Sequence, residues 1–309
     1  MIDIVIVNWN TGNQLRQCID SIVDNLESAI SRIIVVDNNS NDGSENGIIE
    51  KPNVLLLRSR ENLGFSKACN LGATHASSDL ILFLNPDTLI FPHTFSKVLK
   101  FMELEKNSKI GICSIQLYDE TGDISHSCSR FPFLFGYINK AIGLSLFFPK
   151  LSMPMNEWDH STSRSVEQVI GAFFLVRRSI FISLNGFDER FFMYFEEVDF
   201  SLRAKRLGWI SYFFSDAQSF HRGGGSSGQI KSTRLFYHLR SRIKYSIKHF
   251  NFWSVAILII LSLIIEPFTR SLNALFFRFS LTLLKETISA YFMLYRWLLK
   301  KFAIRYKLN

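Results

Sequence analysis

The sequence predicts an α/β fold with a mostly parallel, Rossmann-like central sheet and helices on both of its faces. Short runs of β-branched residues alternate with helix-like segments from the start of the chain, which indicates successive β-α-β units. The strand-like runs are apolar at every position, as is typical of strands covered on both sides. Polar clusters directly follow these runs, and ligands of such sheets bind at the carboxyl ends of the strands.

The first part of the chain supplies the elements of this rhythm. Strands are expected over residues 4–7, 33–36, 54–57 and 80–84, and helices over residues 14–26 and 66–76. Residues 118–164 mix glycine, proline, serine and aromatic side chains, and we interpret them as a long irregular insertion. A second ordered block covers residues 166–221. The glycine-rich run 223–228 then predicts a mobile loop near the end of the folded body.

The charge distribution separates this body from a tail. Residues 231–309 hold 14 Lys and Arg side chains but 2 Asp and Glu, whereas residues 1–230 hold 21 basic and 25 acidic side chains. A nucleic-acid-binding protein normally carries positive charge on its folded domain, so nucleic acid is not expected as a partner. We predict one domain over residues 1–230 and a basic, apolar helical region over residues 231–309 that associates with an anionic membrane surface.

Within the tail, residues 234–250 have the pattern of a basic amphipathic helix, and residues 252–265 form an uncharged run of 14 residues. A helix of that length covers about 21 Å, less than the ~30 Å of the hydrocarbon core. The apolar segments that follow are interrupted by Arg278, Lys285 and Arg296. We expect helices that lie in or dip into the membrane interface. A true span, and a buried helical subdomain or oligomer interface, are the alternatives.

The cysteines and the opening residues indicate the compartment. Cys18, Cys69, Cys113 and Cys128 are scattered without a C-x-x-C pair, so neither a disulfide framework nor a zinc site is favoured. A reducing cytosol is the simpler interpretation. The opening residues are strand-like and lack the basic and apolar regions of a secretory signal. We therefore expect the folded body to lie on the cytoplasmic side.

Two polar turns follow early strands. The segment 35–43 brings Asp37 and several amides from a buried strand end into a turn, where the carboxylate could accept a hydrogen bond from a nucleobase N–H. The alternative is a turn that satisfies its own backbone. The segment 61–70 places Asn62 and Gly64 before a helix whose N-terminus can face an anion. Either turn alone is weak support for a binding site.

Candidate metal ligands occur at two places. Asp87 follows the strongly apolar strand 80–84, and one or two carboxylates with substrate phosphates are the usual ligands of magnesium. The alternative is an aspartate that caps a helix or turn. His221 precedes the glycine-rich run and could complete a metal site and cover a diphosphate, although a single histidine is more often structural.

Three acids lie within four residues at Glu196, Glu197 and Asp199, and large aromatic residues precede them. Apolar surroundings can raise the pKa of one such carboxyl so that it serves as a general base. Acids are also favoured at a helix N-terminus by the helix dipole, and the two roles are compatible. The cluster is therefore the candidate for proton transfer.

Taken in this order, the motifs resemble family 2 glycosyltransferases of the GT-A fold, and within them the rhamnosyltransferase-like enzymes of bacterial surface polysaccharide (O-antigen) assembly. The resemblance runs from Ile4 to about Arg222 and is most specific in the segments NPD and FDERFFMYFEEVDFSLR. It implies that Asn8-Trp9-Asn10 lines the nucleotide pocket and that Asp37 recognises the base. The implied nucleotide-sugar site consists of Asn8, Asn10, Asp37, Asn39, Asn62, Gly64, Asn85 and Asp87.

The resemblance also implies a metal site and a base. Asn85-Pro86-Asp87 matches the D-x-D position of the family with asparagine in place of the first acid, so Asp87 is the implied ligand of Mg²⁺ or Mn²⁺, with His221 near the metal and diphosphate. Glu196-Glu197 occupies the family's Glu-Asp motif, which makes Glu197 the implied catalytic base and Glu196 the alternate. Asp199 would support the loop and helix.

The implied activity is inverting transfer of a sugar from a nucleotide diphosphate donor to a hydroxyl of a polyprenyl-diphosphate-linked saccharide, at the cytoplasmic face of the inner or plasma membrane. L-Rhamnose from dTDP-rhamnose is the family-level expectation for the donor. One alternative is a non-catalytic, sugar-nucleotide-binding scaffold subunit, which the departures at Asn85 and Glu197 allow. A nucleotidyltransferase is a poorer alternative, because the N-terminal region lacks a Gly-rich, basic phosphate-binding turn.

Overall fold

The computed structural model describes residues 1–25, 29–51, 53–142, 144, 150, 152–223 and 230–307, with residues 302–307 described for the backbone alone. The described chain forms two compact units. The first comprises residues 1–131, 153–192 and 196–226, and the second comprises residues 132–152, 193–195 and 227–309. The second unit thus takes in residues 132–152 and 193–195 in addition to the tail predicted from residue 231.

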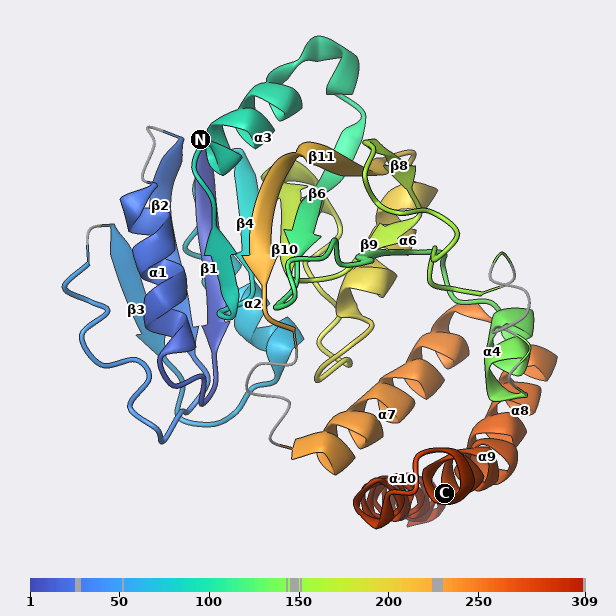
Figure 1. Cartoon of the computed structure of the whole chain (residues 1–309). Coiled ribbons are helices and arrows are strands. Elements are labelled where there is room, and N and C mark those ends of the chain that lie inside the picture. Colours follow the sequence, from blue (N-terminus) through green and yellow to red (C-terminus); the bar gives the residue numbers. More distant parts are fainter. Residues whose placement is uncertain are drawn as a thin grey trace. The chain divides into compact units, whose positions relative to one another are not determined.

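A mixed sheet forms the centre of the first unit. Its strands are β1 (Ile2–Asn8), β2 (Ile30–Asp37), β3 (Val54–Arg58), β4 (Leu80–Leu84), β5 (Thr88–Ile90), β6 (Ile110–Tyr118), β8 (Arg164–Val166), β10 (Phe173–Arg177) and β11 (Ile210–His221). The strand order is β3-β2-β1-β4-β10-β6-β11-β5, and β8 pairs with β11 (Figure 1). Strands β3, β2, β1 and β4 are parallel, as are β6 and β11, whereas β10 is antiparallel to both of its neighbours. The predicted mostly parallel sheet is confirmed.

Helices cover both faces of this sheet. They are α1 (Gln14–Asp24), α2 (Phe65–Ala73), α3 (Thr94–Glu103), the 3₁₀ turn η1 (Glu105–Asn107), α5 (Arg178–Ser183) and α6 (Glu196–Arg206). Ile4 and Ile6 of β1 belong to the core beneath α1 and α3, whereas Val5 and Val7 belong to the core beneath α2, α5 and α6. Successive apolar residues of one strand therefore pack on opposite faces, which explains the uninterrupted apolar runs.

Helix α2 ends earlier than the predicted residue 76. Its last residue is Ala73, because the chain then turns back toward the start of the sheet. There the Asp3 carboxylate accepts hydrogen bonds from the backbone N–H groups of Ser77 and Ser78 at 2.6 and 2.7 Å. A buried carboxylate that binds two backbone N–H groups fixes where the next strand begins.

The predicted irregular insertion is divided between the two units. Strands β7 (Cys128–Ser129) and β9 (Gln168–Val169) pair as a small separate sheet. Helix α4 (Leu134–Ala141) belongs to the second unit. All four cysteines of the chain lie buried in the first unit as free thiols.

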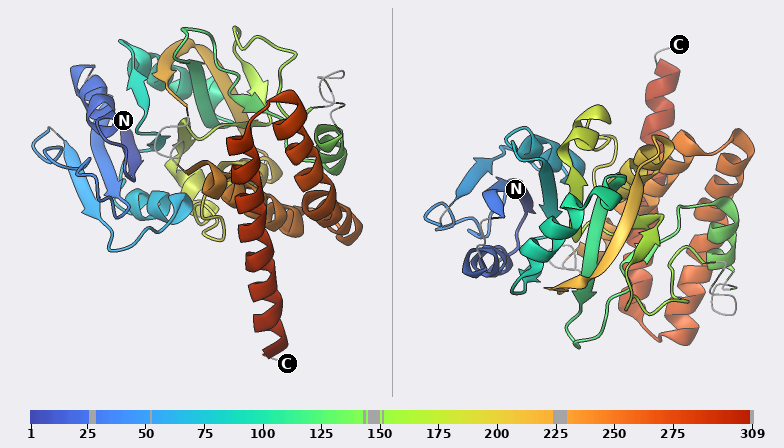
Figure 2. Two further views of the ribbon diagram at one scale, coloured as in Figure 1. Left: turned by 60° about the horizontal axis from the view of Figure 1, so that its bottom comes forward. Right: turned by 90° about the horizontal axis from the view of Figure 1, so that it is seen from above.

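The second unit is helical. After α4, it contains α7 (Lys231–His249), a continuous helix over residues 252–277 and α10 (Leu281–Lys307) (Figure 2). The continuous helix consists of α8 (Phe252–Ile260), the π-helical η5 (Leu261–Ile265), α9 (Glu266–Leu272) and the π-helical η6 (Asn273–Phe277). We call it helix 252–277. Helix α7 packs against α8 and α10.

The expected length of the apolar helix is wrong. Helix 252–277 has 26 residues and is long and apolar enough to cross a membrane by length and composition, whereas the sequence pattern ended it at residue 265. It continues because the Glu266 carboxylate is buried against Arg242 of α7, so the first charge after the apolar run need not face solvent. The predicted mobile glycine loop falls largely on residues 224–229, which lie outside the described residues.

Candidate active site

The first polar cluster lies where the central parallel strands β1 and β2 end. Asn8 and Asp37 are register partners, and both side chains are buried. The Asn8 amide donates to Asp37 Oδ1 at 2.8 Å and to Ser44 Oγ at 2.8 Å, while the Ser40 N–H donates to Asp37 Oδ2 at 3.2 Å. The carboxylate is thus held in place by a neighbour on β1 and by the turn that follows β2.

The turns after β1 and β2 each contain an asparagine with positive φ. Asn10 has φ 51° and Asn39 has φ 64°, a left-handed conformation that asparagine adopts more readily than most residues. The Asn10 amide oxygen accepts from the Asn41 N–H at 2.9 Å. Asn39 is exposed. The predicted nucleotide-binding residues of β1 and of these turns are therefore gathered at one edge of the sheet.

Asn38 connects this cluster with the start of α2. Its amide oxygen accepts from the Leu63 N–H at 2.7 Å, and its amide nitrogen donates to Asn62 Oδ1 at 3.0 Å. Asn62 Oδ1 also accepts from the Gly64 N–H at 3.0 Å. Sequence reasoning did not select Asn38, although it adjoins Asp37. The available signal was its place between Asp37 and Asn39 at the end of a fully apolar strand.

Gly64 allows the backbone at Phe192 to approach the start of α2. Its φ is +80°, and a Cβ at this position would lie 2.5 Å from the Phe192 carbonyl oxygen. That oxygen accepts a hydrogen bond of 2.6 Å from the N–H of Phe65, the first residue of α2. Only glycine combines this conformation with this approach. The first N–H of the helix, proposed to face an anion, is therefore used by the backbone that leads toward α6.

Asp87 and His221 meet at the next strand ends. Strand β5 begins at Thr88, whose register partner on β11 is His221. Asp87 Oδ1 lies 3.3 Å from His221 Nε2, and the two side chains are 7% and 11% exposed. The Asn85 amide nitrogen lies 3.5 Å from the same imidazole nitrogen. The structure brings together the two residues predicted to bind metal.

The Asp87–His221 pair fits a divalent cation. Adjacent ligands of an octahedral ion bound at about 2.1 Å would lie about 3 Å apart, close to the 3.3 Å between Asp87 Oδ1 and His221 Nε2. Across the residues that the structure describes, no group of three or more His, Cys, Asp and Glu side chains could hold a metal. Further ligands would have to come from substrate oxygens and water, as is usual for Mg²⁺.

Glu196 and Glu197 form the first turn of α6. Glu197 Oε2 is buried and has no hydrogen-bond partner among the described residues. Burial raises the pKa of the Glu197 carboxyl to about 7, because the charged form loses its hydration. Burial and the charges of both glutamates raise the pKa of the Cys69 thiol on α2. The acids therefore lie near α2.

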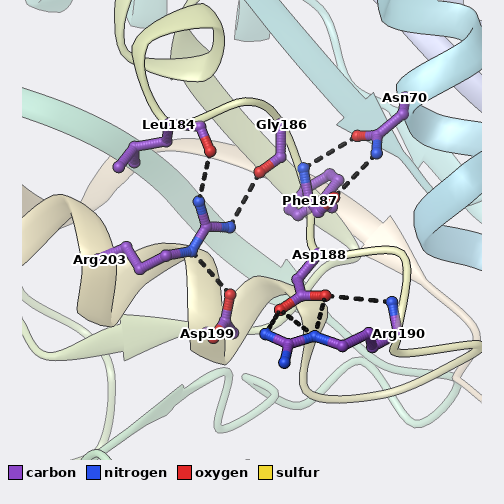
Figure 3. Close-up of polar contacts among 8 residues, drawn as sticks. All are labelled: Asn70, Leu184, Gly186, Phe187, Asp188, Arg190, Asp199 and Arg203. Atoms are coloured by element: carbon purple, nitrogen blue, oxygen red, sulfur yellow. Dashed lines mark hydrogen bonds and ion pairs between the residues drawn. The ribbon is translucent and has the colours of Figure 1, made fainter. Parts of the chain in front are cut away.

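Asp199 has a different surrounding from the two glutamates. It is fully buried, and its Oδ2 accepts from Arg203 Nε at 2.7 Å (Figure 3). The same guanidinium donates to the carbonyl oxygens of Leu184 and Gly186 at 2.7 and 2.9 Å. The Asp199–Arg203 pair thus ties α6 to the turn before Phe187. The supporting role expected for Asp199 stays a prediction.

Asn70 of α2 fixes the other side of that turn. Its amide oxygen accepts from the Phe187 N–H at 2.9 Å, and its amide nitrogen donates to the Phe187 carbonyl at 2.8 Å (Figure 3). A Cβ on Gly186 would lie 2.5 Å from this amide oxygen. The turn before Phe187 is therefore held by side chains of both α2 and α6. Sequence reasoning did not select Asn70 for this role.

Backbone strain occurs directly before the acids. Tyr194 and Phe195 have φ of 67° and 73°, a region that costs aromatic residues of the order of 1–3 kcal/mol each. Such conformations persist only where the surroundings impose them and are concentrated at functional sites. The chain therefore enters α6 in a strained conformation immediately before Glu196.

The family model described as glycosyl transferase family 2 matches residues 3–184. A curated relative, N-acetylglucosaminyl-diphospho-decaprenol L-rhamnosyltransferase of Mycobacterium tuberculosis (strain CDC 1551 / Oshkosh), is 28% identical over 275 residues, which are 82% of this chain and 86% of the relative. Rhamnosyltransferase WbbL of Escherichia coli K12 is 29% identical over 171 residues, which are 55% of this chain and 62% of that protein. The matches agree with the family resemblance of the motifs.

A solved structure shares the fold. The mannosyltransferase PcManGT of Pyrobaculum calidifontis, in complex with GDP-Man and Mn²⁺, has a TM-score of 0.54 at 13% identity and covers 94% of this chain and 73% of that chain. At this identity the similarity concerns the fold alone. It places the mixed sheet and its flanking helices with GT-A-like proteins.

Proposed function

This chain belongs to glycosyl transferase family 2, and we propose that it is an inverting enzyme that moves a sugar from a nucleotide diphosphate to an acceptor hydroxyl. The observation that carries the proposal is the Glu197 carboxyl at the head of α6, whose Oε2 is buried and whose pKa burial raises to about 7. A group with this pKa can accept a proton near neutral pH. A carboxylate fixed by a simple ion pair would be a much weaker base.

The nucleotide would bind at the ends of β1 and β2. Asp37 would accept from a base N–H, and its orientation is supported by the hydrogen bonds from Asn8 and from the Ser40 N–H. Asn10, Asn39, Asn62 and Gly64 would line the same pocket. A binding group that is already oriented loses little entropy when the ligand arrives.

Asp87 and His221 would hold Mg²⁺ or Mn²⁺, and Asn85 would contact the donor beside them. The 3.3 Å between the two side chains supports this assignment, as does the Mn²⁺ in the archaeal mannosyltransferase complex. When bound, the cation would neutralise charge that develops on the leaving diphosphate.

Glu197 would act on the acceptor. The acceptor oxygen would form a bond to the anomeric carbon as the bond from that carbon to the diphosphate oxygen breaks. The hydroxyl proton would pass to the Glu197 carboxylate, with Glu196 as the alternate base. Attack opposite the leaving group inverts the anomeric carbon, and no second carboxylate nucleophile is required.

The proposed donor is dTDP-L-rhamnose, and the proposed acceptor is a polyprenyl-diphosphate-linked saccharide in cell-surface polysaccharide synthesis, such as that of O-antigen. The names of the mycobacterial and E. coli relatives support rhamnose, and the mycobacterial name supports a lipid-linked acceptor. The second unit would hold the protein at the cytoplasmic face of the membrane. Its excess of 14 basic over 2 acidic side chains in residues 231–309 favours an anionic surface.

The test is donor turnover by purified protein with a panel of nucleotide sugars, with Mg²⁺ or Mn²⁺ and then with EDTA. Wild type is compared with Glu197→Gln and Asp87→Ala, and Glu103→Gln on α3 is the surface control. We expect release of a nucleoside diphosphate from dTDP-rhamnose that both site variants lose and the control retains.

Donor binding without turnover on any acceptor, unchanged by Glu197→Gln, would instead support the non-catalytic scaffold. Absence of binding to every donor would contradict the transferase. Full turnover in EDTA would contradict the metal site while leaving the base intact.

A further inference from the structure

Helix 252–277 of the second unit has one apolar, exposed side. The exposed residues recur at spacings of three or four and are between 44% and 73% exposed: Trp253, Ile257, Ile260, Ile264 and Phe268. The side facing the other helices is buried and includes Leu258, Leu261, Ser262, Glu266 and Ala274. A soluble surface seldom leaves such a long apolar stripe uncovered.

Apolar exposure also occurs in the turn after this helix and along α10. At the turn, Phe276, Phe277 and Phe279 are 64%, 77% and 84% exposed. Along α10 the stripe consists of Leu281, Ile288, Phe292 and Leu299, each between 58% and 69% exposed. Lys285 and Arg296 of α10 lie to one side of this stripe in the helical projection, where their long side chains can keep charge in a polar layer while the stems contact apolar surroundings.

Length alone would allow helix 252–277 to cross a bilayer. Its 26 residues extend over about 39 Å, more than the ~30 Å of a hydrocarbon core. The buried side of the helix is incompatible with that placement. Arg242 of α7 donates to Ser262 Oγ at 2.8 Å and forms a two-pronged ion pair with Glu266, so α7 must accompany the helix.

Helix α7 is too charged to enter hydrocarbon. It carries six Lys and Arg residues and no acid in its sequence KSTRLFYHLRSRIKYSIKH. Ser262 lies ten residues after Phe252, so in a spanning helix it would be about 15 Å deep. Arg242 beside it, and Lys244 next along α7, would then be drawn near the middle of the bilayer, where each charge is costly.

We propose that helix 252–277 and α10 lie in the plane of an anionic bilayer surface, with the exposed apolar stripe immersed and both ends of helix 252–277 on the same side of the membrane. The occupant is a lipid leaflet because apolar exposure coincides with a strong basic excess in residues 231–309. This inference deepens the membrane location in the proposed function and rests on it, but it does not depend on the sugar transferred.

Topology is tested with single cysteines at the two ends of the helix. Ile247 is 61% exposed on α7, shortly before the helix begins, and Arg278 is exposed directly after it. Because the four native cysteines are buried, Ile247→Cys and Arg278→Cys give a low background. Both are expressed in a bacterial host and treated with a membrane-impermeant maleimide in intact cells, in inverted membrane vesicles and in detergent.

We expect both cysteines to have the same labelling pattern, protected in intact cells and reactive in inverted vesicles. Opposite patterns for the two positions would establish a span and overturn the proposal. Labelling in detergent reports whether each new thiol is accessible to the reagent once the membrane barrier is removed.

Lipid binding is tested by flotation with phosphatidylcholine vesicles that contain either no anionic lipid or about one-third phosphatidylglycerol. We expect at least about tenfold stronger binding to the anionic vesicles. The triple variant Phe276→Ser, Phe277→Ser and Phe279→Ser should lose at least about tenfold in binding. The matched control replaces Ile49 and Leu207, which are 55% and 59% exposed in the first unit, with serine and should bind like wild type.

If the triple variant bound vesicles as tightly as wild type, the proposal that these apolar residues enter the bilayer would be overturned. A stable lipid-free dimer that does not bind vesicles would show that a second copy covers the face. Donor hydrolysis in the same preparations separates the two proposals. Failed flotation with intact hydrolysis would contradict the placement of the helices on the membrane. Normal flotation without hydrolysis would contradict the transferase.

Discussion

The carboxyl groups at the two ends of the candidate site have different surroundings. At the ends of β1 and β2, Asp37 is supplied with hydrogen bonds by Asn8 and by the Ser40 backbone. At the start of α6, Glu197 Oε2 is buried without a hydrogen-bond partner among the described residues, and the pKa of its carboxyl rises to about 7. The hydrogen bonds fix the orientation of the Asp37 carboxylate, whereas burial disfavours the charged form of Glu197 and lets it exchange a proton near neutral pH. The first end suits recognition and the second suits proton transfer.

The largest expected effect comes from removing the ionisable group at the second end. Glu197→Gln should lower kcat by about a thousandfold, because general base catalysis typically contributes 10²–10⁴-fold. Donor affinity should stay within about threefold of wild type, since the substitution conserves shape. Steady-state kinetics and calorimetric donor titration measure the two quantities. A comparable loss of donor affinity would contradict the proposal that one end binds the donor and the other transfers the proton.

Gly64→Ala should disrupt the contact between the start of α2 and the Phe192 backbone that leads toward α6. Positive φ costs a non-glycine residue about 1–2 kcal/mol, and the added Cβ would also press on the Phe192 carbonyl oxygen. We expect a loss of about 3 kcal/mol in the free energy of unfolding, measured by denaturant titration. Gly122→Ala is the control, because its φ is +84° but nothing lies within 4 Å of its Cβ. Equal losses in both variants would mean that the Phe192 contact contributes nothing.

At the first end, Asn8→Ala removes the amide that donates hydrogen bonds to Asp37 Oδ1 and to the serine hydroxyls of the following turn. Leaving a buried acceptor without its partner costs about 1–3 kcal/mol. We expect the donor Kd to rise about tenfold with kcat little changed at saturation. Asn156→Ala, at an exposed asparagine of the first unit, should leave Kd unchanged. A fall in kcat at saturating donor would contradict a purely binding role.

The smallest effect is the pH dependence of the wild-type enzyme. With a Glu197 pKa of about 7, kcat/KM should rise about tenfold between pH 6 and pH 8 as the carboxyl loses its proton. Residual activity of Glu197→Gln should lack this rise. The same carboxyl stabilises the fold fully below its unfolded pKa near 4.5, and this contribution is lost as pH rises through about 7. A wild-type profile that is flat over this interval would assign the base elsewhere.

Local patterns were sufficient for much of the fold. Strand β4 has the predicted bounds at Leu80–Leu84, because an uninterrupted apolar run between turns leaves little choice. The proximity of Asp87 and His221 could also be anticipated, since each follows or ends a strand and the sheet brings those ends together. The roles of Asp37, Asp87 and Glu197 remain predictions that the proposed experiments address.

Long-range contacts account for what the sequence did not reveal. The Phe192 carbonyl meets Phe65 across more than a hundred residues, and no periodicity signals such a bond. Helix 252–277 exceeds its predicted end because Arg242, on another helix, neutralises Glu266. Helix α4 joins the second unit although it lies within the predicted first domain. In the first two cases the deciding partner lies on another element.

The strand order also has a consequence for synthesis of the chain. Strand β6 pairs with β10 and β11 in the sheet, and its eight residues from Ile110 to Leu117 are buried in the finished protein. About sixty residues separate the end of β6 from the end of β10. At roughly 5–20 residues per second, a ribosome needs about 3–12 s to make that stretch. During this interval the nascent chain exposes an apolar strand without its sheet partners. Co-expressed chaperones or a lower growth temperature should therefore improve the yield of soluble protein.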